Sequence, residues 1–403
     1  MKLKPKHTLL AGYVGYVTQA ITINFAPLLF LTFEKQYGIS FTKISLLIAI
    51  SFVTQLFFDV LLAKISKYIN QRATVVLGHV SAVLGMTGFL WLPEVLPSAY
   101  AGLIICVILA AIGGGIIEVL ISPIVEACPL ENHSAAMSLL HSFYCWGLAG
   151  VVLLSTLFFH FIGIEHWQIL AALWGIVPLV GALAFCVVPL YELEADKEEN
   201  AAKTKDNSGL RSGLFLLFFG MMFCAGAAEQ AMSQWASTFA ESGLKVSKSV
   251  GDLLGPLAFA VLMGFARVLY AKTSNRINLS RFIAISAALC VVAYIVTALS
   301  PIPLLSLISC AVCGLSVGIM WPGTYSLAAE RLPNVTVSMF AILAIAGDLG
   351  CLVGPTLAGW IADMFGNDLK LSFLICPVFP IFILVFGLWI KAKTKEKSNS
   401  KKS

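Results

Sequence analysis

Long apolar runs separated by short polar stretches dominate this chain. A helix that crosses the hydrocarbon of a bilayer needs about 20 mainly apolar residues, because its backbone must satisfy its own hydrogen bonds there. The pattern predicts twelve such helices, at residues 8–32, 41–63, 73–93, 98–122, 133–160, 167–190, 213–240, 249–271, 281–299, 302–325, 335–361 and 371–390. Only Ser300 to Pro303 separates the ninth from the tenth, so a single bent hairpin is the alternative there.

One long polar stretch, rich in both acidic and basic residues, follows the sixth predicted helix. It divides the chain into an N-terminal six-helix bundle (1–190), a cytoplasmic linker (191–212), a C-terminal six-helix bundle (213–391) and a Lys-rich cytoplasmic tail (392–403). The expected fold is therefore an all-α membrane protein.

The two halves repeat each other. Residues 59–70 and 267–278 are identical at seven of twelve positions at a constant offset of 208, and the segment from Gly115 to Pro129 echoes the one from Gly318 to Pro333. Two parallel, pseudo-symmetric six-helix repeats are the plan of the major facilitator fold, which the chain resembles in this respect. Chance similarity between apolar segments is the alternative reading of the repeat.

The basic residues indicate the orientation. Of the 26 Lys and Arg residues, 20 fall on the side of the N-terminus and only five in the opposite loops. By the positive-inside rule both termini are cytoplasmic, and we expect a multi-pass protein of the cytoplasmic (plasma) membrane. The first apolar run is too long for the core of a signal peptide and is expected to remain as the first helix.

Composition excludes several classes of function. Hydrophobic residues make up 59% of the chain and charged residues 12%, with a mean hydropathy of +0.91. No phosphate-binding loop, nucleophile elbow or metal-ligand cluster is found, so neither an enzyme nor a cofactor nor a metal is expected. The net charge of +5 is explained by basic loops beside anionic lipid, and no nucleic-acid partner is predicted. The ten cysteines, including the Cys310-x-x-Cys313 pair, are expected to pack as small apolar residues.

Three acidic residues lie away from the ends of predicted helices, where a carboxylate is least expected, namely Glu118, Glu229 and Asp348. A carboxylate at the centre of a bilayer costs about 2.5 to 3.5 kcal/mol, so such a residue normally faces a cavity or a partner and is a candidate for function. We expect these residues to bind substrate or to couple transport to protons. A hydrogen-bonded structural acid is the alternative reading of each.

Polar and aromatic side chains that suit a neutral hydroxylated ligand occur in the same helices. The candidates are Gln19, Asn24, His141, Tyr144, Trp146, Gln230, Gln234, Trp235 and Trp321. Together they favour a lined cavity, although any single one is better explained as a contact or packing between helices. Asp59 and Arg267 occupy equivalent ends of the second and eighth helices, where they are expected either to brace the two halves as a gate or to reach the head groups.

Three segments resemble the fucose permease branch of the major facilitator superfamily, the fucose/galactose/glucose:proton symporters. They are Gly113-Gly-Gly-Ile-Ile-Glu118-Val-Leu-Ile-Ser-Pro123, His141-Ser-Phe-Tyr-Cys-Trp-Gly147 and Glu229-Gln-Ala-Met-Ser-Gln-Trp235. The resemblance implies that Glu118 takes part in handling protons and sugar. The first helix, however, lacks the aspartate of the fucose transporters, and Ser122 stands where their pattern has Asn.

We therefore expect a monomeric secondary transporter that moves a small polar solute, a sugar in the first place, by alternating access with proton coupling. Two alternatives stay open: a proton-driven efflux antiporter for amphiphilic compounds, and a membrane sensor that binds a ligand without transporting it.

Overall fold

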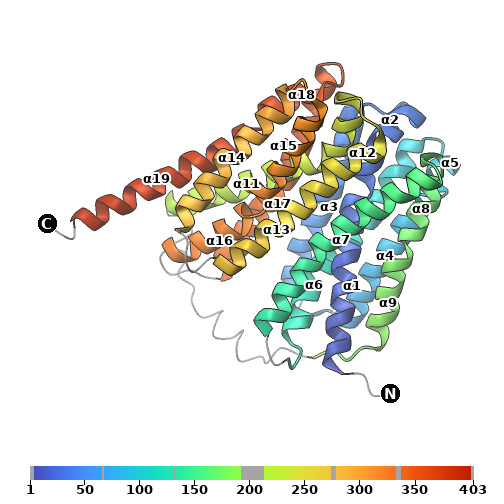
Figure 1. Cartoon of the computed structure of the whole chain (residues 1–403). Coiled ribbons are helices and arrows are strands. Elements are labelled where there is room, and N and C mark those ends of the chain that lie inside the picture. The colour runs from blue at the N-terminus through green and yellow to red at the C-terminus, as the bar shows by residue number, and fades with distance from the viewer. Residues whose placement is uncertain are drawn as a thin grey trace. The chain divides into compact units, whose positions relative to one another are not determined.

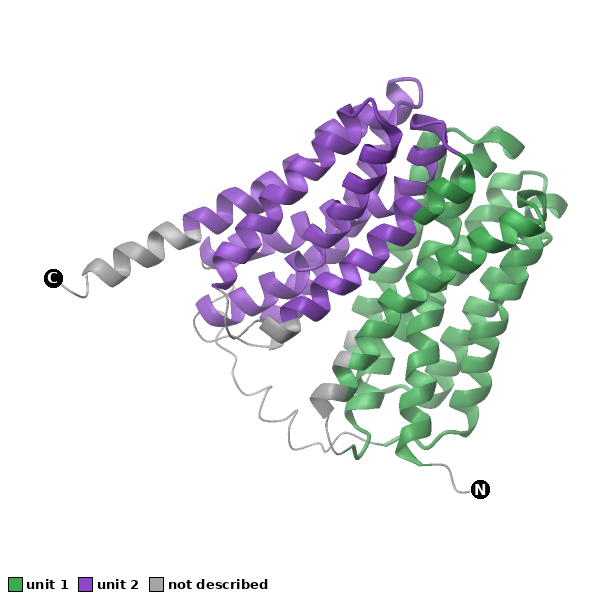
Figure 2. Ribbon diagram, viewed as in Figure 1, with its two compact units in different colours: residues 1–195, 247–253 green, residues 196–246, 254–403 purple. Residues whose placement is uncertain are grey.

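The computed structural model describes residues 4–65, 68–130, 133–191, 213–273, 278–332 and 337–400, and the described elements are all helical (Figure 1). The predicted linker 191–212 lies outside the described residues except for Tyr191. The chain divides into two compact units, and one short segment belongs to a different unit from its neighbours in sequence (Figure 2). Unit 1 comprises Met1–Ala195 with Ser247–Leu253, and unit 2 comprises Asp196–Val246 with Leu254–Ser403.

Unit 1 is a bundle built around α6, the most apolar of its long helices. Its elements are α1 (Pro5–Asn24), η1 (Ala26–Leu29), α2 (Phe30–Tyr37), α3 (Phe41–Ile65), α4 (Gln71–Gly88), α5 (Leu92–Val95), α6 (Ala99–Glu126), α7 (His133–Phe161), η3 (Ile164–His166), α8 (Trp167–Trp174), α9 (Ile176–Val187) and α12 (Lys248–Asp252). Helix α6 packs against α1, α3 and α4, and its buried residues Ile116, Ile117, Leu120 and Ile121 form the centre of the core.

Unit 2 is organised around the pair α11 and α17, which pack along their lengths. Its elements are α11 (Gly213–Thr238), η5 (Phe239–Gly243), η6 (Leu253–Leu257), α13 (Ala258–Thr273), α14 (Leu279–Leu299), α15 (Pro303–Val317), α16 (Met320–Arg331), α17 (Val337–Met364), α18 (Leu369–Ile375) and α19 (Val378–Ser400). Helices α14 and α15 are separate, so the ninth and tenth predicted spans are two helices.

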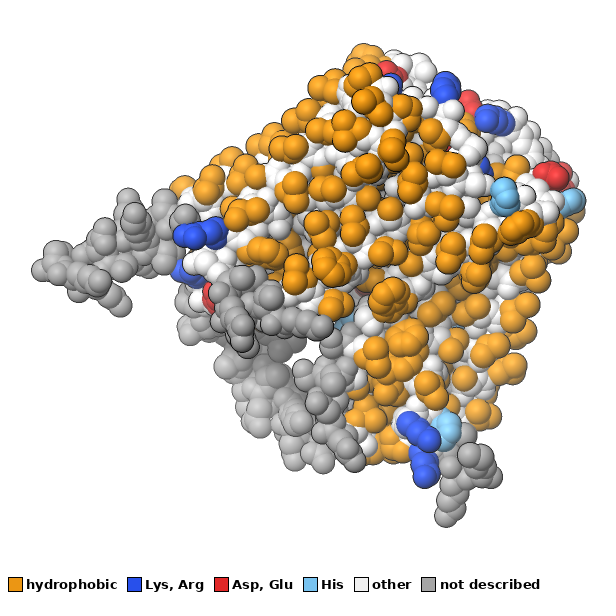
Figure 3. Space-filling view, viewed as in Figure 1, with side chains coloured by type: hydrophobic (Ala, Val, Ile, Leu, Met, Phe, Trp, Pro, Cys, Tyr) orange, Lys and Arg blue, Asp and Glu red, His pale blue; other side chains and the backbone are white. Residues whose placement is uncertain are grey.

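Within the described residues, eleven helical stretches are long and apolar enough to cross a membrane. The remaining predicted span, 73–93, coincides largely with α4, an 18-residue helix that carries Arg72 and the buried His79. Helix α4 packs against α6 and α9, which explains how it tolerates more polar residues than its neighbours. On the face seen in Figure 3, hydrophobic side chains cover the middle of the helices, while charged side chains occur near helix ends. Such a surface is suited to lipid.

The internal repeat has a physical counterpart at the starts of α4 and α14. Asn70 and Asn278 are the N-caps of these helices, and they adopt the same backbone conformation, with φ near −76° and −75° and ψ of 107° for both. Each side chain accepts a hydrogen bond of 3.0 Å from the amide three residues later, that of Ala73 or Arg281. The matching Asn positions in the sequence therefore mark equivalent helix starts.

Two glycines of the second echo also play equivalent roles. A Cβ on Gly115 of α6 would lie 3.1 Å from the carbonyl oxygen of Gln55 on α3, and a Cβ on Gly318 would lie 2.7 Å from that of Met263 on α13. Gln55 and Met263 are themselves related by the offset of 208. The same close approach of two helices is thus made within each unit, as expected for a structural repeat.

Replacing Asn278 by Ala should fray the first turn of α14. Loss of a side-chain N-cap costs about 1 kcal/mol, equivalent to about fivefold faster local opening. Hydrogen exchange read by mass spectrometry would measure it in peptides that contain the amide of Arg281. Asn278→Ser, which retains a capping oxygen, is the matched control; equal exchange in the two variants would contradict the cap assignment.

Candidate functional site

A buried hydrogen-bond cluster in unit 1 is centred on Glu118, in the cytoplasmic half of α6 by the predicted orientation. The amide of Gln19 on α1 donates to Oε2 of Glu118 at 2.7 Å. The amide of Gln55 on α3 donates to the same oxygen. Helices far apart in sequence therefore converge on one oxygen of this carboxyl group, and both donors are uncharged amides. An amide can donate to a carboxylate and to the carbonyl oxygen of a protonated carboxyl group, so this arrangement is chemically compatible with either state.

A second hydrogen bond joins α1 to α6 one turn away from Glu118. The hydroxyl groups of Tyr16 and Ser122 lie 2.7 Å apart, and the Tyr16 ring meets His141 of α7 edge-on, with ring centroids 5.1 Å apart. Tyr16 precedes Gln19 by three residues and Ser122 follows Glu118 by four, so each pair shares a helix face. The α1 and α6 faces that carry the Glu118 cluster are therefore joined at two successive levels.

The aromatic residues of α7 continue this polar region along α1. Asn24 donates to the hydroxyl oxygen of Tyr144 at 3.3 Å and to the carbonyl oxygen of Ala20 at 2.9 Å. Phe143 stacks on Tyr13, with centroids 4.1 Å apart and planes 6° from parallel. Five of the residues predicted for unit 1 therefore lie on the facing sides of α1, α6 and α7. They are Gln19, Asn24, Glu118, His141 and Tyr144. Trp146, by contrast, is 60% exposed.

Sequence reasoning missed two members of this region, Gln55 and Tyr16, and treated Ser122 only as part of a motif. Gln55 could have been found, because an amide in the interior of the apolar run 41–63 is a costly group that needs a partner. Tyr16 carries no comparable signal, since a tyrosine in a helix is usual at many depths. Only its contact with Ser122 and His141 distinguishes it.

Unit 2 contains a second carboxylate, with a different kind of partner. Oε2 of Glu229 on α11 lies 3.6 Å from Nη2 of Arg267 on α13, so the two form an ion pair. The amide of Gln230 donates to Oε1 of Glu229 at 3.4 Å, and that of Gln234 donates to Oε1 of Gln230 at 3.1 Å. The predicted residues Glu229, Gln230 and Gln234 thus form one chain of polar contacts that ends on a guanidinium group.

The remaining predicted residues of unit 2 are placed as follows. Trp235 is fully buried, and its indole N–H donates to the carbonyl oxygen of Pro355 at 2.9 Å, which ties α11 to α17. Trp321, at the start of α16, packs against Gly347 of α17, one residue before the partly exposed Asp348. The indole of Trp235 is therefore a packing contact in this structure, and the ring of Trp321 joins α16 to α17 at Gly347.

The gate proposed for Asp59 and Arg267 stays a prediction. Asp59 lies on α3 of unit 1 and Arg267 on α13 of unit 2. Arg267 has a partner in its own unit, Glu229, that the sequence did not suggest.

Comparisons with known proteins agree with this architecture. The sequence profile of the Major Facilitator Superfamily matches residues 10–354 and 258–403. A membrane protein of Rhizobium meliloti, MosC, is 28% identical over 161 residues, which are 40% of this chain and 39% of MosC. The matched part therefore spans about two fifths of that relative.

Solved structures share the fold at low sequence identity. A D-xylose–proton symporter superposes with a TM-score of 0.76 at 15% identity, covering 95% of this chain and 96% of its own. A bacterial homologue of the human lysosomal transporter Spinster gives a TM-score of 0.77 at 14% identity, covering 97% and 98%. A mutant form of the nucleoside transporter NupG gives 0.73 at 13% identity, covering 95% and 98%. With the family profile matching most of its length and the helical architecture that of the superfamily, this chain belongs to the Major Facilitator Superfamily and has the fold of its transporters.

Proposed function

We propose that the protein is a proton-coupled symporter for a small hydroxylated solute, with a sugar as the first candidate, and that Glu118 is the group that exchanges the proton. The observation that carries the proposal is the Glu118 carboxyl group, which lies within a 28-residue apolar helix and is held by the amides of Gln19 and Gln55. Placing a carboxyl group inside an apolar membrane helix costs free energy, so a residue that does so is expected to serve a function.

The difference between the two carboxylates supports the choice of Glu118 over Glu229. Glu229 has a guanidinium partner in Arg267, so protonating it would dissolve an ion pair. The hydrogen bonds that Glu118 receives from Gln19 and Gln55 come from neutral amides, and both end on Oε2. Its other oxygen, Oε1, is then the atom that we assign to the exchanged proton and to a substrate hydroxyl group.

The sugar is favoured by the polar and aromatic side chains on α1 and α7. Amide and hydroxyl groups such as those of Asn24 and Tyr144 bond hydroxyl groups, and aromatic faces suit the C–H side of a sugar ring. The segments that resemble the fucose permease branch agree with this choice, and a sugar–proton symporter and a nucleoside transporter are among the proteins that share the fold. We further propose that the chain acts as a monomer in the plasma membrane, with both termini in the cytoplasm and Asp59 and Arg267 as gate residues.

Uptake into proteoliposomes tests the proposal. The purified protein would be given an inside-alkaline pH gradient and a panel of radiolabelled D-xylose, D-glucose, D-galactose, L-fucose and uridine. We expect accumulation of at least one of these compounds that is lost when a protonophore collapses the gradient. Uptake that ignores the protonophore would contradict proton coupling.

Two further readouts separate the alternatives. Gradient-driven export of preloaded ethidium, with no uptake from the panel, would favour an efflux antiporter. A panel compound that raises the melting temperature of the protein without crossing the membrane would favour a sensor, because ligand binding alone stabilises the folded state.

A further inference from the structure

Two cysteine side chains are in contact inside unit 2. Sγ of Cys290 on α14 lies 3.8 Å from Sγ of Cys313 on α15, and both residues are buried free thiols. The sequence groups Cys313 with Cys310 in a C-x-x-C pattern, whereas the structure brings its sulfur to a cysteine 23 residues earlier in the chain. The function proposed above makes no use of this pair.

The internal repeat indicates that helix packing does not require thiols at this contact. The offset of 208, which relates the starts of α4 and α14, places Ala82 at the position of Cys290. The offset of 203 in the second echo places Ala110 at the position of Cys313. Both alanines are buried where α4 packs against α6. A small apolar side chain is therefore sufficient at each place in unit 1, and the meeting of two thiols in unit 2 is a property of its own.

The thiol pair lies beneath a surface suited to lipid. Helix α14 coincides with one candidate membrane span, Leu279–Leu299, and α15 forms the first part of the next, Pro303–Arg331. Both helices also carry exposed apolar side chains, among them Leu289, Val292 and Ile308. Hydrocarbon surrounds such a surface and excludes charged solutes. A reagent that reaches the pair from outside must therefore be neutral and soluble in lipid.

We propose that Cys290 and Cys313 form a redox modification site, which a neutral, lipid-soluble two-electron oxidant converts into a disulfide bond between α14 and α15. The two S–H bonds break and one S–S bond forms, while the oxidant accepts two electrons and two protons. Reduction of a disulfide requires attack by a thiolate, and the thiolates of water-soluble reductants do not enter this interior, so the bond persists once it has formed. The proposal does not depend on which solute is transported.

Oxidation of the full-length protein in proteoliposomes tests the proposal. N-ethylmaleimide first blocks accessible thiols such as the exposed Cys186. Excess diamide is then applied, a neutral azo compound whose N=N bond takes up two hydrogen atoms as two thiols are oxidised. The protein is unfolded, its remaining thiols are alkylated, and unreduced peptides are identified by mass spectrometry. Chymotrypsin is the suitable protease, because it cleaves after Tyr294, whereas no Lys or Arg lies between the two cysteines. We expect a peptide joining Cys290 to Cys313, at least about tenfold more abundant than any other linked pair.

Matched variants identify the partner of Cys290. Cys313→Ala introduces the residue that unit 1 has at this position, and it should remove the linked peptide and leave Cys290 as a free thiol. Cys310→Ala is the control, because Cys310 is 1% exposed on the same helix, and it should leave the yield of the linked peptide unchanged. A bond that either thiol of the C-x-x-C pattern could form would survive both single variants.

The bond should also raise the thermal stability of the protein. It joins residues 23 apart in sequence, and a cross-link of this kind restricts the unfolded chain. Because the two sulfur atoms already touch, the folded state needs little adjustment. We expect oxidised protein to melt about 5 °C above oxidised Cys313→Ala at one scan rate.

Three results would overturn the proposal. One is a Cys290 that stays a free thiol in the folded protein, while a sample unfolded in sodium dodecyl sulfate forms disulfides under the same treatment. Another is an equal yield of a Cys290 disulfide in Cys313→Ala, which would mean that the contact with Cys313 does not direct the reaction. The last is a lower melting temperature after oxidation, which would mean that the two thiols are not placed for the bond.

Discussion

Glu118→Gln should abolish gradient-driven accumulation of the transported solute while leaving exchange of labelled for unlabelled solute across the membrane. Glutamine has the size of glutamate, and its carbonyl oxygen can accept the hydrogen bonds that Gln19 and Gln55 now donate to Oε2. The amide nitrogen that replaces Oε1, however, cannot take up or release a proton. With the compound that the uptake panel identifies, uptake driven by a pH gradient measures accumulation, and counterflow in proteoliposomes without a gradient measures exchange.

Glu126→Gln is the matched control for this experiment. It makes the same change at the exposed C-terminal end of the same helix, and we expect both activities to remain. Full accumulation by Glu118→Gln would refute the role proposed for Glu118. Loss of exchange together with accumulation would instead assign the residue to substrate binding, and the proton would then need another carrier.

Arg267→Met should destabilise the protein strongly, because it leaves the Glu229 carboxylate buried without its cation. Removing one partner of a buried ion pair costs about 3 to 5 kcal/mol, and we expect about 3 because the Arg267 side chain is 33% exposed. For a unit of this size, that loss lowers the melting temperature by on the order of 10 °C. Thermal unfolding in detergent, compared at one scan rate, is the measurement.

The double variant Glu229→Gln, Arg267→Met distinguishes an ion pair from a general packing effect. It removes both charges, so most of the lost stability should return. Arg281→Met, which removes an exposed Arg from the start of α14, should change stability by no more than about 0.5 kcal/mol. If the double variant were as unstable as Arg267→Met alone, the pair would not explain the position of Arg267.

The Glu118 and Arg267 experiments together separate two roles that the sequence could not separate. By hydropathy alone, Glu118 and Glu229 are equivalent acids in apolar helices, and both are predicted to bind substrate or couple transport. Their partners make the difference. The amide donors of Glu118 lie 99 and 63 residues away in sequence, on α1 and α3, and hydropathy does not tell which helix faces which.

The sequence predicted the helices best, because the free-energy cost of placing polar groups in lipid acts on each residue independently of its partners. Lipid offers no hydrogen bonds, so every span must be an apolar helix, and the runs could be read directly. The same cost identified Glu118 and Glu229 as unusual. The repeat was readable because Asn70 and Asn278 meet the same local demand, the capping of a helix start within three residues.

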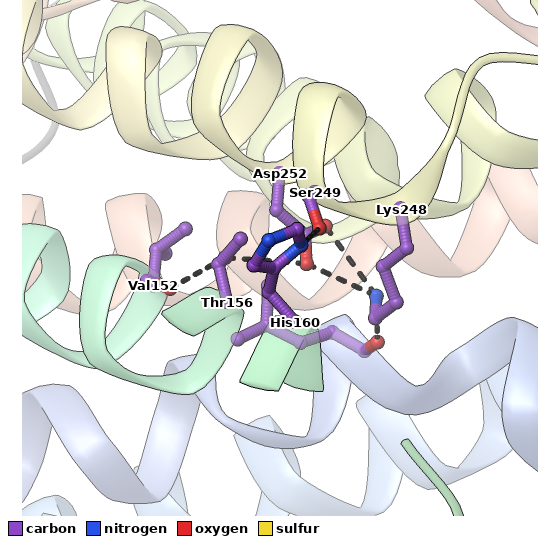
Figure 4. A network of polar contacts seen from close by, with 7 residues as sticks. Val152, Thr156, His160, Lys248, Ser249 and Asp252 are labelled. Atoms are coloured by element: carbon purple, nitrogen blue, oxygen red, sulfur yellow. Dashed lines mark hydrogen bonds and ion pairs between the residues drawn. The ribbon is translucent and has the colours of Figure 1, made fainter. Parts of the chain in front are cut away.

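Only the tertiary structure decided the features that depend on the direction in which a side chain points or on contacts between distant segments. Trp235 matches a motif yet is buried against Pro355, and Trp146 is exposed although Tyr144, two residues earlier, meets Asn24. The assignment of α12 to unit 1 is the clearest case, because side chains of this short helix bond residues of η1 and α7 (Figure 4). Apolarity and local spacing determined which segments are helices and how deep each polar group lies. The residue that each polar side chain contacts is instead a property of the packed bundle, since it depends on which helix faces meet after folding.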